Sequence, residues 1–354
     1  MEFGRNVSVV TPPTDLEKWD AVGPVRTIRR ETASWDSARG DWGVPGQHSE
    51  ADLRPDGRLV EERFFNPDGS LVHTSWTYDG AGRAIQSRQW TNTSQQLTRF
   101  IYDADGRPAR SVDVAADGSE RVAETWGEDS LGRRSKVRFL QEVVAPDHGM
   151  VLLSYTVPGA TTTTTTYDEH ENPIEILSHD ANHALLFTVT FTRDRDGHVL
   201  IEEARFVGDL PFARQLDERF AAAPEEDREK ARRLLTMAFD DGRLSTVEYQ
   251  RDSDGRIVSS IRRMGVMNEE RTTCSYDSHG NLTEEINEQR SSNISLDESG
   301  AIVTHEEAPI SNHYRFDYVY DERGNWIEKV GWVKIGEDFT RVNIERREFS
   351  YYMR

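Results

Sequence analysis

The chain has 354 residues, of which 63 are acidic and 43 basic, so its net charge is −20. Nucleic acids and anionic membrane surfaces bind through basic patches, so this charge argues against both as partners. Cys274 is the single cysteine and is expected to pack as a small hydrophobe. No stretch is long and apolar enough to span a membrane, so we expect no membrane insertion.

Residues 1–49 are expected to form an N-terminal strand and loop region. The segment 25–35 alternates weakly and predicts a first strand, whereas 38–47, with three glycines and one proline, predicts a loop. No signal peptide is visible. If Met1-Glu2-Phe3 is a cloning remnant, a native leader is expected to be missing from the sequence.

From residue 50 onward, a Tyr-Asp-x-x-Gly-Arg/Asn motif recurs. Its turn glycines are spaced 12 to 14 residues apart, for example Gly57, Gly69 and Gly82. Each interval fits one strand of about eight residues and one tight turn. The clear copies begin at Tyr78, Tyr102, Tyr276 and Tyr320, and the weaker ones at Arg54, Trp126, Tyr167, Phe191 and Tyr249.

Apolar residues two positions before the motif aromatics, such as Phe100 before Tyr102, indicate strands with one buried face. The run Thr161–Thr166 suits the same pattern and is expected to be a solvated strand, with a ligand-binding threonine face as the alternative. About 18 to 20 strands exceed what an open twisted sheet holds. The predicted fold class is therefore all-β, with one long antiparallel sheet curved into a spiral or a wide barrel-like wall.

These motifs resemble the RHS/YD-repeat family over residues 50–354. The stretches 320–326 and 346–352 are similar to the end of small YD-repeat proteins of bacterial envelopes. The resemblance implies antiparallel hairpins, in the largest members wrapped as a shell around a toxin segment. This chain has several times fewer repeats and no recognisable cargo domain, so a toxin is not implied. We expect a bacterial protein of the cell envelope or a secreted one, with the cytoplasm as an alternative.

The period changes to helical between residues 209 and 241. Asp209 can cap a first helix, and Pro224 can open a second. This helical insertion is expected to interrupt one continuous YD-repeat sheet formed by 50–208 and 242–354. It would serve as a plug at the sheet's end or as a lid over a ligand cavity.

A second interruption is predicted at residues 291–313. This segment reads as a long connection between strands. Long connections on a regular scaffold are places where functional residues tend to lie.

Three groups of polar residues invite a metal-binding interpretation. His170 and His179 flank a predicted strand and lie about 30 Å apart, so they cannot share an ion. His179, Asp180 and His183 can meet in one turn, although such clusters are usually solvated. The Asp-x-Asp-Gly turns are expected to bond their own backbone rather than calcium. We therefore expect no metal and no cofactor. These turns are Asp103–Gly106, Asp194–Gly197 and Asp252–Gly255.

Tryptophans are the best candidates for a ligand-binding surface. Trp90 and Trp332 lie off the motif, whereas Trp76 and Trp126 are more suited to packing against neighbouring strands. Trp326 completes the candidate set. No catalytic residue is predicted, because no phosphate loop, nucleophile elbow or catalytic triad is recognisable.

Three functions remain open. The first is a non-catalytic scaffold that binds a glycan, an envelope component or a protein partner. The second is an enzyme with its site in the cavity of the curved sheet, lidded by 209–241. The third is a partial shell that encloses a peptide or partner.

Overall fold

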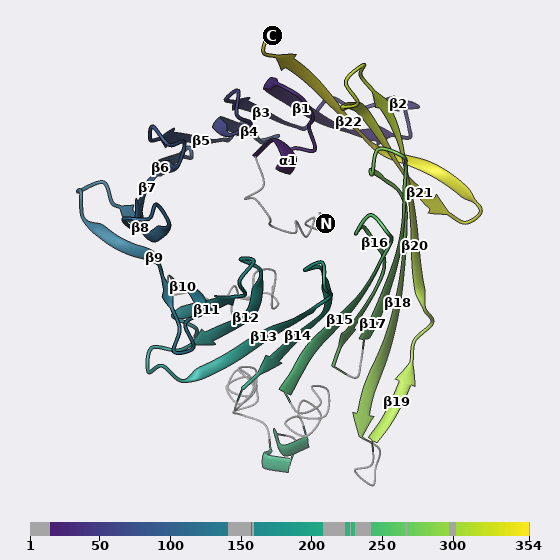
Figure 1. Ribbon diagram of the computed structural model, residues 1–354. Coiled ribbons are helices and arrows are strands. Elements are labelled where there is room, and N and C mark those ends of the chain that lie inside the picture. Colours follow the sequence, from purple (N-terminus) through teal and green to yellow (C-terminus); the bar gives the residue numbers. More distant parts are fainter. Residues whose placement is uncertain are drawn as a thin grey trace. The chain divides into compact units, whose positions relative to one another are not determined.

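A computed structural model describes residues 15–140, 157, 159–207, 224–226, 228–230, 242–265, 268–296 and 302–353. The regular elements of the described residues are almost all antiparallel strands, so the predicted all-β antiparallel class is confirmed (Figure 1). The chain divides into two compact units. The first unit comprises mainly Trp126–Cys274 and Ile286–Asn312, and the second comprises Val9–Thr125, Ser275–Glu285 and His313–Arg354.

In the first unit, strands that follow one another along the chain pair antiparallel with each other (Figure 1). Short turns join most of these pairs, whereas longer segments separate β10 from β11 and β14 from β15; each strand is about as long as the glycine spacing predicts. The strands are β10 (Arg134–Phe139), β11 (Thr162–Tyr167), β12 (Pro173–His179), β13 (Leu185–Arg193), β14 (Val199–Phe206), β15 (Arg243–Arg251), β16 (Ile257–Met264) and β17 (Asn268–Tyr276).

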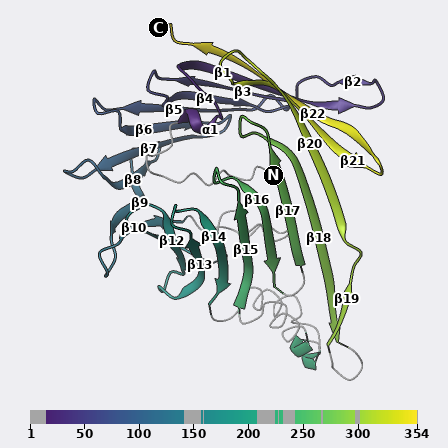
Figure 2. The same cartoon turned by 45° about the vertical axis from the view of Figure 1, so that its right-hand side comes forward.

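In the second unit, the last strand of the chain pairs with the first. Val25 in β1 lies opposite Tyr351 in β22, and β1 also pairs with β3, from which the ladder continues to β9. Figure 2 shows β20, β21 and β22 side by side, as their pairing requires. The strands are β1 (Val25–Asp36), β2 (Asp41–Trp42), β3 (Gln47–Leu53), β4 (Leu59–Phe65), β5 (Leu71–Tyr78), β6 (Ala84–Trp90), β7 (Gln95–Tyr102), β8 (Pro108–Val114), β9 (Glu120–Glu128), β20 (Ile310–Tyr320), β21 (Trp326–Ile335) and β22 (Asp338–Tyr351).

The repeated motif forms the tight turns between these strands. In the turn between β5 and β6, the Gly82 N–H donates to the Asp79 carbonyl (3.0 Å) and the Asp79 N–H to the Arg83 carbonyl (2.9 Å). Gly82 has a φ of 78°, which suits glycine, and the strand register shifts beside it. A type I turn followed by a left-handed residue gives this geometry. Glu171 stands at the glycine position of its copy and still adopts a φ of 63°.

Each unit has its own apolar core. In the second unit, a short helix, α1 (Asp15–Lys18), precedes a segment that packs on the inner residues of β1, β3 and β4. Trp76 packs against this core, which confirms its predicted packing role. The buried members are Trp19, Ala21, Val25, Ile28, Ala51, Leu53 and Leu59; those in the first unit are Val157, Ala160, Phe187, Val189, Ala204, Phe206 and Leu244.

The irregular segments differ from expectation. The predicted connection 291–313 is wrong: β18 (Leu282–Leu296) and β19 (Ile302–Glu306) pair as a hairpin, and β20 begins at Ile310. Serine, threonine and asparagine in this segment hid its alternating pattern. The predicted loop 38–47 contains β2, which pairs with the end of β1.

The helical insertion at 209–241 lies almost entirely outside the described residues. Residues 225, 226 and 228–230 are helical, and Lys230 pairs with Glu226 at 2.8 Å, one helical turn away. Among the described residues, no helix is long and apolar enough to cross a membrane.

Candidate functional site

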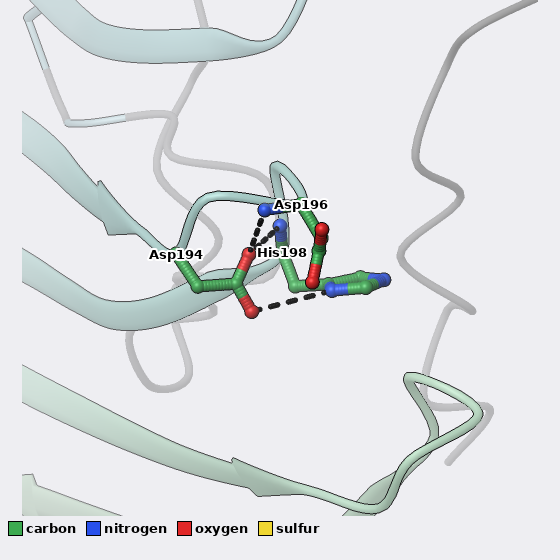
Figure 3. Close-up of side chains that lie close together, drawn as sticks. All are labelled: Asp194, Asp196 and His198. Atoms are coloured by element: carbon green, nitrogen blue, oxygen red, sulfur yellow. Dashed lines mark hydrogen bonds and ion pairs between the residues drawn. The ribbon is translucent and has the colours of Figure 1, made fainter.

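One group of described side chains has the spacing of a metal site. Asp194, Asp196 and His198 lie in the turn between β13 and β14, with candidate ligand atoms within 4.8 Å of one another (Figure 3). However, Asp194 Oδ1 accepts hydrogen bonds from the backbone N–H groups of Asp196 and His198, both at 2.9 Å. Its Oδ2 lies 3.3 Å from His198 Nδ1. Burial acts to raise the pKa of Asp194, but these hydrogen bonds outweigh it and lower that pKa.

The same arrangement recurs where no histidine is present. The first Asp carboxylate accepts two backbone N–H bonds in the turns that begin at Asp103 and Asp252. The prediction that these carboxylates bond their own turns is therefore confirmed, and the group in Figure 3 is one more copy of the turn. The strand β12 separates His170 from His179, as predicted.

The motif also connects successive copies. The hydroxyl of Tyr78 donates to the carbonyl of Leu59 at 2.5 Å, and that of Tyr102 to Ala84 at 2.8 Å. Each acceptor directly follows the arginine that closes the preceding turn. The Arg83 guanidinium lies over the Tyr102 ring, 4.8 Å from its centroid. These motif tyrosines and arginines therefore link one copy of the motif to the next.

The five predicted tryptophans occupy different environments. Trp326 is 4% exposed, with the Arg347 guanidinium 3.4 Å from its ring centroid, so it is a core residue. Trp126 is half-buried, with the Lys136 ammonium 5.9 Å from its ring. Trp90 is half-buried and stacks on its cross-strand partner His73 at 4.6 Å. Trp76 packs on the core, as described above.

Trp332, the remaining candidate, belongs to a larger cluster in the second unit. Arg341 lies over the rings of Trp35, Trp42 and Trp332, at 5.0, 5.9 and 5.1 Å from their centroids. Arg315 lies over Trp332 at 5.3 Å and over Phe339 at 5.1 Å. We call this group the tryptophan–arginine cluster: Trp35, Trp42, Arg315, Trp332, Phe339 and Arg341.

Strand pairing builds this cluster from five strands. Trp35 and Trp42 are paired across β1 and β2, with their rings edge to face at 5.0 Å. Trp332 in β21 lies opposite Arg341 in β22. Its indole N–H donates to Asp317 Oδ2 at 2.8 Å, which fixes the ring's orientation. Cation–π contacts of this kind hold aromatic rings in place.

The cluster is accessible and locally cationic. The Arg315 side chain is 45% exposed, and Arg341 is exposed; the tryptophan rings are half-buried. Asp317 is the one acidic partner among these contacts, 3.6 Å from Arg315. Within these contacts two guanidinium groups face one carboxylate, on a chain with net charge −20.

Sequence reasoning found one member of this cluster and missed the rest. Trp35 and Trp42 lie in the irregular N-terminal region, and their partners come from the C-terminal strands. The signal available was the pair Trp35 and Trp42, one just before the 38–47 segment and one within it. Nothing in the local pattern shows that β1 pairs with β22.

The comparisons with known proteins do not identify a family. No protein-family model and no curated protein matches the chain. A porin-like protein from Bacteroides uniformis ATCC 8492 aligns over 92% of this chain and 96% of its own, at 11% identity and a TM-score of 0.32. An outer membrane lipoprotein-sorting protein domain from Vibrio parahaemolyticus aligns over 54% of this chain and 83% of its own, at 12% identity and 0.18.

A variant of transferrin binding protein B from Haemophilus parasuis Hp5 aligns over 92% of this chain and 77% of its own, at 8% identity and a TM-score of 0.17. All three TM-scores lie below 0.5, so the similarities support no conclusion about function.

Proposed function

We propose that this chain is a non-catalytic β-repeat scaffold of the YD-repeat type that binds a glycan through the tryptophan–arginine cluster. The observation that carries this proposal is the convergence of three half-buried indole rings under one exposed guanidinium, that of Arg341. The proposed setting is the cell envelope or the exterior of a bacterial cell, where glycans are abundant.

Indole rings suit a sugar because their flat apolar faces can cover its C–H face. Binding sites combine such aromatic walls with a few oriented polar groups that fix the ligand. Here Arg315, Arg341 and Asp317 supply donors and acceptors for hydroxyl groups. Because Asp317 and the two arginines already hold the Trp332 ring, little side-chain freedom would be lost on binding.

The local charge favours an acidic glycan over a neutral one. Two arginines face one aspartate in this cluster, and a guanidinium can bind a carboxylate through two parallel hydrogen bonds. A sugar that bears a carboxylate would match both the aromatic and the cationic components. The net charge of the chain is −20, so an acidic glycan needs a local cationic group such as these two arginines to bind.

Tryptophan fluorescence titration with neutral and uronate-containing oligosaccharides tests the proposal. The uronate oligosaccharide should bind, and Trp332→Ala should weaken its binding at least tenfold. Trp126→Ala is the matched control, because Trp126 also lies beside a repeat and under a cation but outside the cluster. Equal affinity of the wild type and Trp332→Ala would overturn the proposal, as would the absence of any saturable change in the wild type.

A further inference from the structure

A second site, independent of the glycan proposal, lies in the second unit at Lys329. This residue stands in β21 between its strand partners Tyr318 and Glu345. Its ammonium lies 4.8 Å from the Phe316 ring centroid and 5.8 Å from that of Tyr318. Within the part of the chain that the structure describes, Lys329 makes no hydrogen bond and no ion pair within 4.0 Å.

The nearest carboxylate in the strand ladder is already engaged by two other cations. Glu345 Oε1 lies 2.9 Å from Arg30 Nε and 3.6 Å from Arg347 Nε. Arg347 is itself buried, with 5% of its side chain exposed, and it donates to the carbonyl of Trp19 at 2.7 Å. Glu345 is therefore committed to the two arginines and does not pair with Lys329.

The charges around Lys329 do not balance. Three cations, Arg30, Lys329 and Arg347, face the carboxylates of Glu345 and Asp20, which both act on Lys329 from nearby. Burial lowers the pKa of Lys329, and the two arginines lower it further, whereas Glu345 and Asp20 raise it. Burial also lowers the pKa of Arg347 to about 10. A cation withdrawn from water without a partner is costly, and a bound anion would offset that cost.

We infer that Lys329 binds an anionic group, a carboxylate or a phosphate, of a small ligand. Lys329 is half-buried, so part of its side chain remains accessible from solvent. The ammonium offers three donors to anion oxygens. The rings of Phe316 and Tyr318 supply apolar walls on one side, and the Tyr318 hydroxyl is held by the Leu282 carbonyl at 2.9 Å. Aromatic walls around one charged donor are typical of small-molecule sites.

The test uses sodium phosphate and sodium succinate as probes at constant ionic strength, with thermal unfolding of the full chain as the readout. One of the two probes should raise the unfolding midpoint in a saturable manner, by about 2 °C or more. The probe that acts distinguishes a phosphate from a carboxylate ligand. Lys329→Met should abolish the rise and should itself unfold at a higher temperature than the wild type without ligand. Lys334→Met, an exposed lysine on the same strand, should keep the rise.

A rise of equal size in Lys329→Met, or no rise with either probe in the wild type, would overturn the inference. If Lys329→Met does not fold, reductive methylation of the wild type gives a second readout. The NMR signal of dimethylated Lys329 should shift on addition of the active probe, while that of Lys334 should not. A signal that stays unmoved would also refute the site.

Discussion

The guanidinium of Arg83 occupies the space that a β-carbon on Gly106 would need. Its Nη1 lies 2.6 Å from that position, although the two residues close different turns. Gly255 and His198 repeat the relationship at 2.7 Å. The closing residue of one copy therefore lies over the glycine of the next, in addition to the tyrosine hydrogen bonds between copies. The glycine is required both for its positive φ and for this close approach.

Gly106→Ala should destabilise the protein more than Gly118→Ala does. Both glycines have left-handed φ angles, 79° and 83°, but a β-carbon at Gly118 would meet nothing within 4 Å. Gly118→Ala should lower the free energy of unfolding by about 1–2 kcal/mol, because alanine disfavours the left-handed backbone conformation. Gly106→Ala should cost about 1 kcal/mol more, because Arg83 must leave its place. Chemical denaturation of the two variants measures both changes in the free energy of unfolding.

The arginine provides the control for this comparison. In an Arg83→Ala background, Gly106→Ala and Gly118→Ala should lower the free energy of unfolding by the same amount. If Gly106→Ala still costs more there, a contact other than the arginine is responsible.

Tyr320→Phe should destabilise the second unit by about 1–3 kcal/mol. The Tyr320 hydroxyl donates to Asp277 Oδ2 and accepts from Asn281 Nδ2 at 2.8 Å, so its removal takes one hydrogen-bond partner from each of these side chains. Burial, followed by the hydrogen bond to Asp277, raises the pKa of Tyr320 to about 12.

Tyr314→Phe is the matched control for this substitution, since its hydroxyl makes no hydrogen bond to the described residues. It should change the free energy of unfolding by less than about 0.5 kcal/mol. Equal effects of the two substitutions would show that the hydroxyl contacts with Asp277 and Asn281 do not stabilise the fold.

Arg347→Ala should lower the free energy of unfolding by about 3–5 kcal/mol. The substitution removes one buried partner from Glu345 and one from the Trp19 carbonyl. Arg346→Ala, the neighbouring substitution, removes an exposed pair with Glu328 at 3.2 Å and should cost less than about 1 kcal/mol. Hydrogen exchange of residues 19–25 should accelerate in Arg347→Ala alone. Equal exchange in both variants would contradict the role assigned to Arg347.

Stability should fall in acid through the turn aspartates. Burial raises the pKa of Asp277, but the Tyr320 hydroxyl and two backbone N–H groups outweigh it, so the folded pKa lies below the ordinary 3.8. A carboxylate with a depressed folded pKa contributes stability above its unfolded pKa and loses it as pH falls through the folded value. The unfolding midpoint should therefore drop as pH falls below about 4. Asp277→Asn should make that drop shallower; an unchanged slope would contradict this account.

The sequence predicted what is local in this fold and missed what is distant. Asp-x-x-Gly spacing and alternating residues gave the turns and most strands, because both depend on neighbours in the chain. The 291–313 segment was mistaken for a connection because polar residues on both faces of β18 and β19 concealed their period. The pairing of β1 with β22 follows from packing, which the alternation of single strands does not encode.

In the candidate site, too, the residues predicted from the sequence are those with a local signal, and the missed ones depend on distant strand pairing. Trp332 was predicted because it lies off the motif, and Trp326 was predicted for the same surface although it is buried beneath Arg347. Trp35 and Trp42 reach Arg341 only through the β1–β22 pairing. A cation shared by three rings from three strands cannot be read from the spacing of any one of them.

The glycan-binding role can be measured by binding of the fluorescently labelled protein to a panel of immobilised oligosaccharides. Glycans with carboxylate groups should retain the wild type, Trp332→Ala and Arg341→Ala should abolish retention, and Trp126→Ala should preserve it. Retention of no glycan by the wild type, or undiminished retention of Trp332→Ala, would contradict a glycan-binding role for the tryptophan–arginine cluster.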